Sequence, residues 1–394
     1  MQTVGKRISF GFVAAVLVAM TSYAAIGGFA DSGSPEFDEQ VIRVGKAPFP
    51  IAIADVNHDG KLDIIVGNMD DSTVSVLLGD GRGHFRPAPG SPLACNANPN
   101  DIAVTDMNGD GNPDLVIANT QTPYLTVLLG DGKGGFKPSA HSPFATKSYP
   151  HPHGVAVGNF MGDGNPAVVT DSWGHHQILL IPSDEKGDLL LPGKFFPADL
   201  HTDSGVDAAD FNKDGNLDIV TVDQDANVVG LLLGDGKGGF RKAPGSPFPA
   251  GDTPWYSTVG DVNGDGNPDV AVVPYEPQMR DPKQLGLTIL LGDGKGGMAP
   301  MRGSPFSLAG CEEPSRVAIG DIRGDGLRDI VVSCAKNDKL FFFMGTKDGR
   351  FNVFTRSISI GWGGVALADL TGNGKDDLVV SNNKTGTIAI LLSK

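Results

Sequence analysis

The chain has little cysteine, few aromatic residues and a shortage of positive charge. Its three cysteines, Cys95, Cys311 and Cys334, are too few for a scaffold built on disulfides, although an exported protein can hold one bridge. Lysine and arginine number 31 against 46 aspartate and glutamate, and the net charge of −15 argues against nucleic acid as a partner. Aromatic residues make up only 7%, whereas the 55 glycines favour many short strands and turns over long helices.

The amino terminus has the layout of a secretory signal. Lys6 and Arg7 precede an apolar run over residues 8–20, and small residues follow it. This pattern predicts a signal peptide over residues 1–30, cleaved after Ala24 or Ala30, and a linker over residues 31–36. An uncleaved membrane anchor is the alternative, because the weakly apolar stretch continues to Ala30. We therefore expect a secreted, periplasmic or cell-surface protein with no membrane span after signal cleavage.

Four nine-residue segments repeat almost unchanged: DVNHDGKLD at 55–63, DMNGDGNPD at 106–114, DFNKDGNLD at 210–218 and DVNGDGNPD at 261–269. Each has oxygen-bearing side chains at positions 1, 3, 5 and 9 and a glycine at position 6, where a sharp turn is needed. A hard divalent cation takes six to eight oxygen ligands, which such a loop supplies. Carboxylates this close repel one another without a cation. A plain Asp/Asn/Gly turn is the alternative, but four copies favour calcium loops.

The same loop marks a longer repeat that occurs seven times. The first loop positions are Asp55, Asp106, Asn159, Asp210, Asp261, Asp321 and Asp369, between 48 and 60 residues apart. A run of small and β-branched residues precedes each loop, and a second apolar run, a third run with a glycine-rich turn, and a fourth short run follow it. Four strand signals per repeat of about fifty residues indicate a propeller blade. The sequence therefore predicts an all-β fold, a seven-bladed β-propeller of four-stranded blades.

The two ends of the chain predict how the ring closes. The last repeat stops after TIAILLSK, its third strand, while FDEQVIRVG at 37–45 belongs to no blade of its own. We expect this N-terminal strand to complete the C-terminal blade, because closure removes both open sheet edges. The propeller would then span residues 37–394.

The loops and the recurring LLGDGKGGF hairpins resemble FG-GAP repeats of the VCBS type and are similar to the head of integrin α subunits. The resemblance covers nearly the whole mature chain. It implies calcium bound through loop positions 1, 3, 5 and 9 and the backbone carbonyl of position 7. In the complete loops these ligands would be Asp55, Asn57, Asp59, Lys61, Asp63, Asp106, Asn108, Asp110, Asn112, Asp114, Asp210, Asn212, Asp214, Asn216, Asp218, Asp261, Asn263, Asp265, Asn267 and Asp269.

Three loops depart from this pattern. Loop seven, with Asp369, Thr371, Asn373 and Asp377, keeps oxygen ligands but fewer charges, so we expect weaker binding. In loop six Asp321, Asp325 and Asp329 remain, but Arg323 at position 3 would either repel calcium or replace it with its guanidinium. Loop three, with Met161 and Ala167, has lost most ligands, and we expect no calcium there. These differences predict four to six Ca²⁺ sites.

The ends of the blades opposite the metal loops hold the unusual residues, including all three tryptophans. By analogy with the family, propeller ligands meet this face near the axis. Aromatic rings beside carboxylates and imidazoles suit a carbohydrate or an extracellular protein ligand. The alternative is that the aromatics cap the blade packing and that polar loops meet only water. The candidate ligand-binding residues are His151, His153, Trp173, His175, His176, His201, Asp203, Trp255, Tyr256, Glu312, Glu313, Arg316 and Trp362.

Three functional classes remain open on the sequence. We favour a monomeric, non-catalytic binding or adhesion module and name no catalytic residue. A propeller-fold polysaccharide lyase or hydrolase that uses the histidines and carboxylates is the alternative, without a nucleophile motif to support it. A purely structural role is the third.

Two further sites are predicted from cysteine and histidine positions. Cys311 precedes the first strand of blade six and Cys334 ends its second strand, so the two could meet in a disulfide, while Cys95 has no partner in its blade. The blade-three histidines could bind an additional transition metal such as zinc, because imidazole prefers such metals to calcium. A polar surface patch, or scattered histidines without a joint role, are the alternatives.

Overall fold

The computed structural model describes residues 34–146, 152–172, 177–197, 205–275 and 285–394. Within these ranges every regular element is a strand, so the prediction of an all-β fold is confirmed. In the same residues no helix is long and apolar enough to cross a membrane. The predicted signal peptide and the first three residues of the linker, 31–33, lie outside the described residues.

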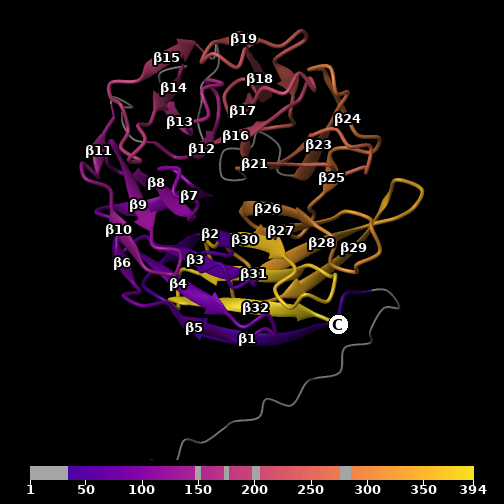
Figure 1. The fold of residues 1–394 in the computed structure, drawn as a ribbon. Coiled ribbons are helices and arrows are strands. Elements are labelled where there is room, and N and C mark those ends of the chain that lie inside the picture. The colour runs from indigo at the N-terminus through magenta and orange to yellow at the C-terminus, as the bar shows by residue number, and fades with distance from the viewer. Residues whose placement is uncertain (1–33, 147–151, 173–176, 198–204, 276–284) are drawn as a thin grey trace, which may run out of the picture. The chain divides into compact units, whose positions relative to one another are not determined.

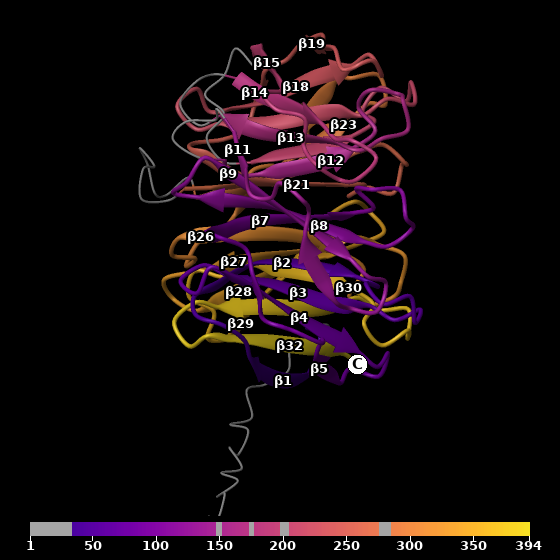
Figure 2. The ribbon, with the colours of Figure 1, turned by 60° about the vertical axis from the view of Figure 1, so that its left-hand side comes forward.

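The strands of residues 35–394 group into seven antiparallel sheets arranged in a ring (Figure 1; Figure 2 shows the same ribbon turned). The innermost strands are β2 (Pro48–Ala54), β7 (Asn98–Thr105), β12 (Val155–Gly158), β16 (Val206–Ala209), β21 (Pro254–Gly260), β26 (Pro314–Gly320) and β30 (Val365–Ala368). The second strands are β3 (Asp63–Asn68), β8 (Asp114–Thr120), β13 (Ala167–Ser172), β17 (Asp218–Asp223), β22 (Asp269–Pro274), β27 (Asp329–Cys334) and β31 (Asp377–Asn382).

The outer half of each blade follows the same order. The third strands are β4 (Thr73–Gly79), β9 (Tyr124–Gly130), β14 (Gln177–Pro182), β18 (Val228–Gly234), β23 (Gly286–Gly292), β28 (Lys339–Gly345) and β32 (Thr387–Ser393). The outermost strands are β5 (Phe85–Pro87), β10 (Phe136–Pro138), β15 (Lys194–Pro197), β19 (Phe240–Lys242), β24 (Met298–Pro300), β29 (Phe351–Ser357) and β1 (Phe37–Arg43). Short return strands follow in four blades: β6 (Leu93–Ala94), β11 (Phe144–Ala145), β20 (Phe248–Pro249) and β25 (Phe306–Ser307).

Each strand's composition fits its radius in the ring. The second strands, such as DIIVGN in β3, are buried at every residue, because neighbouring blades cover both of their faces. They therefore lack the alternation of apolar and polar residues seen in sheets with one solvated face. The innermost strands are rich in alanine and glycine, since seven strands must pass close to one axis. In β2 the four residues IAIA remain half-buried although they lie inside the ring.

The predicted closure of the ring is confirmed. Strand β1 pairs with β32 over seven residues, from Phe37 opposite Ser393 to Arg43 opposite Thr387. Blade seven is therefore the sheet β1-β32-β31-β30, made from both ends of the described chain. Phe37 also contacts Phe342 of blade six, with ring centroids 5.7 Å apart, so the N-terminal strand packs into the apolar cluster between those blades.

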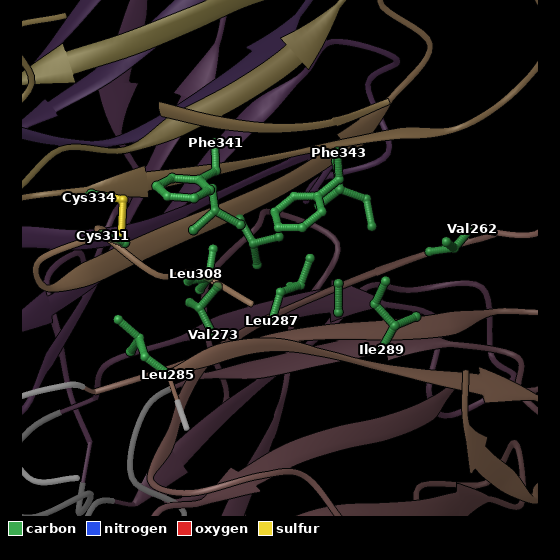
Figure 3. Packing of buried hydrophobic residues seen from close by; sticks show 14 of the residues in the cluster. Val262, Val273, Leu285, Leu287, Ile289, Leu308, Cys311, Cys334, Phe341 and Phe343 are labelled. Carbon is green, nitrogen blue, oxygen red and sulfur yellow. A yellow bond between two sulfur atoms is a disulfide. The ribbon is translucent and has the colours of Figure 1, made fainter. Parts of the chain in front are cut away.

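A disulfide joins Cys311 and Cys334, whose Cα atoms lie 5.3 Å apart. Both sulfurs lie in the apolar cluster between blades five and six, next to Phe341 and Leu308 (Figure 3). Cys95 is a free, buried thiol. This is the cysteine pair that the sequence analysis predicted. A count of free thiols in the unfolded protein would test the bond.

Candidate functional site

The four complete loops lie between the first and second strands of their blades. In the first of them Asp55 is the hub: its Oδ1 accepts the N–H of Asp59 at 3.2 Å and its Oδ2 accepts that of Gly60 at 2.8 Å. The amide Oδ1 of Asn57 accepts the same Asp59 N–H at 2.9 Å. The side-chain oxygens of positions 1 and 3 thus point to one place at the inside of the turn. Loops two, four and five repeat these contacts around Asp106, Asp210 and Asp261.

The position-9 aspartate, predicted to bind calcium, also has a structural role. In the first loop Asp63 accepts the N–H of Val56 at 2.9 Å and that of Gly79, in the third strand, at 2.8 Å. This pair of bonds fastens the loop to the sheet, and each oxygen keeps a second lone pair for a cation. The same pair of backbone bonds is made by six position-9 carboxylates, all fully buried: Asp63, Asp114, Asp218, Asp269, Asp329 and Asp377.

The electrostatics of the complete loops favour a cation. Burial raises the pKa of Asp63 to about 6 although two backbone hydrogen bonds oppose it, and repulsion from Asp59 and Asp55 adds to the rise. Asp114, Asp218 and Asp269 have pKa values raised to about 6 by the same burial. A divalent cation beside such carboxylates would offset both burial and repulsion.

The loops combine three kinds of oxygen donor, carboxylate, amide and backbone carbonyl, and this combination suits calcium. Among the described residues no group of three or more His, Cys, Asp or Glu side chains is gathered closely enough to hold a metal ion. The loops instead offer two outer carboxylates, one amide oxygen and the carbonyl of position 7, with the position-9 carboxylate behind them. Hard-cation sites are commonly built from such mixed oxygen donors.

Loop six has a cation of its own. The Arg323 guanidinium donates to Asp329 Oδ1 at 3.0 Å and to the Gly345 carbonyl, and it lies 3.4 Å from Asp325 Oδ2. It therefore bridges the carboxylates of positions 5 and 9 across the loop. Of the two outcomes expected for Arg323, the geometry favours the guanidinium replacing calcium.

Loops three and seven differ from the complete ones as their sequences suggest. In loop three Ala167 stands where the buried aspartate should be, so no carboxylate fastens this loop to the sheet, and the N–H of Phe160 donates to the Gly158 carbonyl at 3.0 Å instead. In loop seven Asp377 keeps both bonds, to Leu370 N at 2.9 Å and Ser393 N at 2.8 Å. Asn373 and Asp369 repeat the hub contacts with the amide side chain in the place of a carboxylate.

At the opposite ends of the first and second strands, rings from different blades meet. Trp255 stacks on Tyr275 with centroids 4.9 Å apart, and Tyr275 lies 6.3 Å from Trp362 of blade seven. His153 of blade three lies 6.2 Å from Trp255 of blade five. Because these blades are not neighbours, the rings reach one another only across the axis. We call His153, Trp255, Tyr256, Tyr275 and Trp362 the axial aromatic cluster.

A second set of contacts adds charge to the axial aromatic cluster. The Arg316 guanidinium carbon lies 3.2 Å from the centroid of Tyr256 and 4.1 Å from that of Phe49, so it contacts two rings that are inclined to each other at 60°. Trp362 Nε1 donates to Glu313 at 3.2 Å. His153 Nδ1 lies 3.6 Å from the buried carboxylate of Asp171.

Two further carboxylates project from innermost strands. Asp101 accepts the N–H groups of Ile102 and Val155, both at 2.9 Å, and Asp207 accepts the hydroxyl of Ser257 at 2.7 Å. Both residues are half-buried. Burial raises the pKa of Asp207 to about 7 against the Ser257 hydrogen bond, and the charge of Asp101 adds to the rise.

The structure brings together five of the predicted ligand-face residues, His153, Trp255, Tyr256, Arg316 and Trp362, and joins Glu313 to them. Glu312 is exposed and belongs to none of these contacts. The remaining candidates, His151, Trp173, His175, His176, His201 and Asp203, lie outside the described residues, as does most of the predicted transition-metal site. Sequence reasoning missed Phe49, Tyr275, Asp101, Asp171 and Asp207. Asp207 could have been noticed in the sequence, because it is the one charged residue in the run of small residues VDAA.

Comparisons with known proteins agree with this architecture. The profile of the FG-GAP-like repeat matches residues 55–117, 106–170, 210–272 and 321–380. No curated protein matches the sequence. Among solved structures, BBS1N, crystallised in complex with ARL6DN, is similar with a TM-score of 0.59 and 11% identity over 91% of this chain and 97% of that one.

Two bacterial structures show the same fold. A putative 6-phosphogluconolactonase from Bacteroides uniformis is similar with a TM-score of 0.57 and 14% identity over 88% of this chain and 90% of that one. A functionally unknown protein from Desulfotomaculum acetoxidans has a TM-score of 0.56 and 14% identity over 80% of this chain and 91% of that one. At these identities the likeness extends to the fold alone. The repeat profile, however, covers more than half of the sequence, and the chain belongs to the FG-GAP-like repeat family.

Proposed function

We propose that this propeller is an exported calcium-binding module that binds a carbohydrate or an extracellular protein ligand on the face opposite its calcium loops. The observation that carries the proposal is the axial aromatic cluster. Rings from three blades converge there beside carboxylates and one arginine, and the rings stay half-buried instead of sealed in the core. Binding sites for sugars and peptides are commonly lined by aromatic rings together with a few polar groups that orient the ligand.

Calcium would have a structural role in this proposal. Filled loops would relieve the repulsion among their carboxylates and so stabilise the blades from the other face. Loops one, two, four and five would bind it most tightly and loop seven more weakly. Loop three lacks the ligands, and Arg323 takes the place of the ion in loop six.

Calcium binding can be tested by substituting two aspartates that both occupy position 5 of their loops. Asp265→Ala removes a ligand from a complete loop, whereas Asp163→Ala removes the corresponding residue from the decayed loop three. We expect calcium at a hundred times its Kd to stabilise each filled loop by about 2.7 kcal/mol. Thermal melts in calcium and in chelator should therefore show a clear loss for Asp265→Ala and almost none for Asp163→Ala. Identical wild-type melts in the two conditions would refute calcium binding.

The ligand part is tested by binding to a glycan array and to immobilised extracellular proteins, with a parallel screen for polysaccharide cleavage. Trp362→Ala should abolish binding while calcium stabilisation persists, since Trp362 lies at the far end of the blades from the metal loops. Tyr124→Ala is the control, because Tyr124 is an exposed aromatic residue outside the axial aromatic cluster. Cleavage activity that depends on His153 would favour the enzyme alternative, in which buried Asp171 orients the imidazole.

A further inference from the structure

The outer edges of the blades are protected unequally. In blades one, two, four and five the outermost strand is only three residues long, and a Ser-Pro turn with a two-residue return strand follows it. In blade one the serine hydroxyl of Ser91 accepts the N–H of Val76 at 2.9 Å, and the Val76 carbonyl accepts the N–H of Ala88 at 2.9 Å. The third strand's backbone groups between the two short strands are thereby satisfied.

The other three blades with this turn repeat its geometry. The hydroxyls of Ser142, Ser246 and Ser304 accept the N–H groups of Val127, Leu231 and Ile289 at 2.9–3.0 Å. Short outer strands that end next to prolines leave little edge for another chain to extend. Blade three is similar in outline, since its outermost strand has four residues and ends at Pro197.

Blades six and seven lack this protection. Their outermost strands, β29 and β1, each pair along seven residues without a proline. On β1 the exposed residues include Asp38, Glu39 and Arg43, and charges at an edge discourage further pairing. On β29, FNVFTRS, the exposed residues are Asn352, Val353, Thr355 and Ser357, all uncharged, and Val353 is 48% exposed.

The single charged residue of β29, Arg356, does not protect the free edge of the strand. Arg356 is turned to β1, where it pairs with Glu39 at 2.8 Å and lies over the Phe37 ring at 5.5 Å. In the part of the chain that the structure describes, β29 pairs only with β28, and Figure 1 shows it at the rim of the ring. Along its other edge, alternate residues of the seven-residue strand present their backbone N–H and C=O groups, and no charged side chain of β29 protects them.

We propose that the free edge of β29 pairs with β29 of a second copy of this chain, antiparallel and centred on Phe354. In that register Val353 faces the partner's Thr355, Asn352 faces Arg356, and the two Phe354 side chains face each other. The strand is thus self-complementary: no like charges meet, and β-branched and aromatic pairs are favourable across strands. A single strand pair makes a small interface, so the dimer would be weak and concentration-dependent. This replaces the monomer expected from the sequence and does not depend on the proposed function.

Two double substitutions test the register, because residues 353 and 355 face each other in the dimer and are both exposed. Val353→Lys/Thr355→Lys places two Lys–Lys pairs across the interface, whereas Val353→Lys/Thr355→Glu places two Lys–Glu pairs at the same positions. Sedimentation equilibrium of the full protein over a wide concentration range should show a dimer for the wild type. We expect the Lys/Lys variant to weaken dimerisation at least about tenfold, and the Lys/Glu variant to retain it.

Val41→Lys on β1 is the control for added charge, because Val41 is also exposed, at 61%, on the neighbouring unprotected strand. It should leave the dimer unchanged, and thermal melts should show that all variants fold. A wild type that stays monomeric up to its solubility limit would overturn the proposal. A dimer that persists in the Lys/Lys variant, or one that both double variants disrupt equally, would also overturn it.

Discussion

Replacing Arg323 by asparagine should convert loop six into a calcium loop. The variant reads DINGDGLRD, which restores the amide oxygen at position 3 and removes the guanidinium from between Asp325 and Asp329. The prediction has two parts with opposite signs: a loss of stability in chelator and a gain of one calcium site.

The loss can be estimated from the ion pair. Asp329 is fully buried, and burial raises its pKa to about 6 even though Gly345 N and Arg323 lower it. Removing one partner of a buried pair costs about 3–5 kcal/mol. The Arg323 side chain is 30% exposed and Asp329 keeps two backbone hydrogen bonds, so we expect about 1–3 kcal/mol here. At about 2 °C per kcal/mol for a large domain, Tm in chelator should fall by about 2–6 °C.

The gain appears when calcium is added. Saturation at a hundred times Kd would return about 2.7 kcal/mol, so the Tm gap between variant and wild type should close. Differential scanning calorimetry measures the gap in each condition, and titration calorimetry should find one more calcium per chain in the variant. Arg328→Asn is the control, because it removes the same charge from an exposed position of the same loop. An unchanged calcium count together with an unchanged Tm in chelator would refute the role assigned to Arg323.

Three smaller predictions follow from single contacts. Because the pKa of Asp207 is raised to about 7 in the folded protein, the stability that its protonated form contributes is present at low pH and is lost as pH rises through 7. Asp207→Asn should therefore raise the free energy of unfolding by roughly 2 kcal/mol at pH 8 and by much less at pH 5. Thermal melts that show the same effect of the substitution at both pH values would contradict this. Ser304→Ala should cost about 1 kcal/mol in denaturant unfolding, whereas Ser307→Ala, on an exposed residue two positions past Pro305, should cost less than about 0.5. Thiol titration should find one group, Cys95, on unfolding and none in the native protein; three would exclude the disulfide.

The fold could be predicted because its repeat is visible in the residues themselves. Seven loops at a near-constant spacing fix the number of blades, and an unassigned strand at one end with a missing strand at the other fixes the closure. The Ser-Pro turns were equally visible, as PGSP, AHSP and RGSP, but their purpose was not. A serine hydroxyl that caps the N–H of a strand fifteen residues upstream becomes apparent only when both segments lie in one sheet.

The candidate site was harder to predict because its contacts cross the ring. Trp255 and Trp362 were identifiable as unusual residues near the starts of strands. Tyr275 follows a second strand within an otherwise ordinary run, and Phe49 opens a first strand, so neither stood out. Which rings meet depends on the positions of non-adjacent blades around the axis, and a repeat pattern, which relates each blade only to the next, carries no such information.

Calcium content is the most direct measurement of the central claim, that the repeated loops are metal sites. Wild-type protein at equilibrium with calcium in dialysis, with bound metal determined by elemental analysis, should hold four ions from loops one, two, four and five and a fifth, more weakly bound, from loop seven. Asp55→Ala/Asp261→Ala should reduce the content by two, and Asp163→Ala should not change it. Protein that binds no calcium at millimolar concentration would contradict the account, and so would a content that these substitutions leave unchanged.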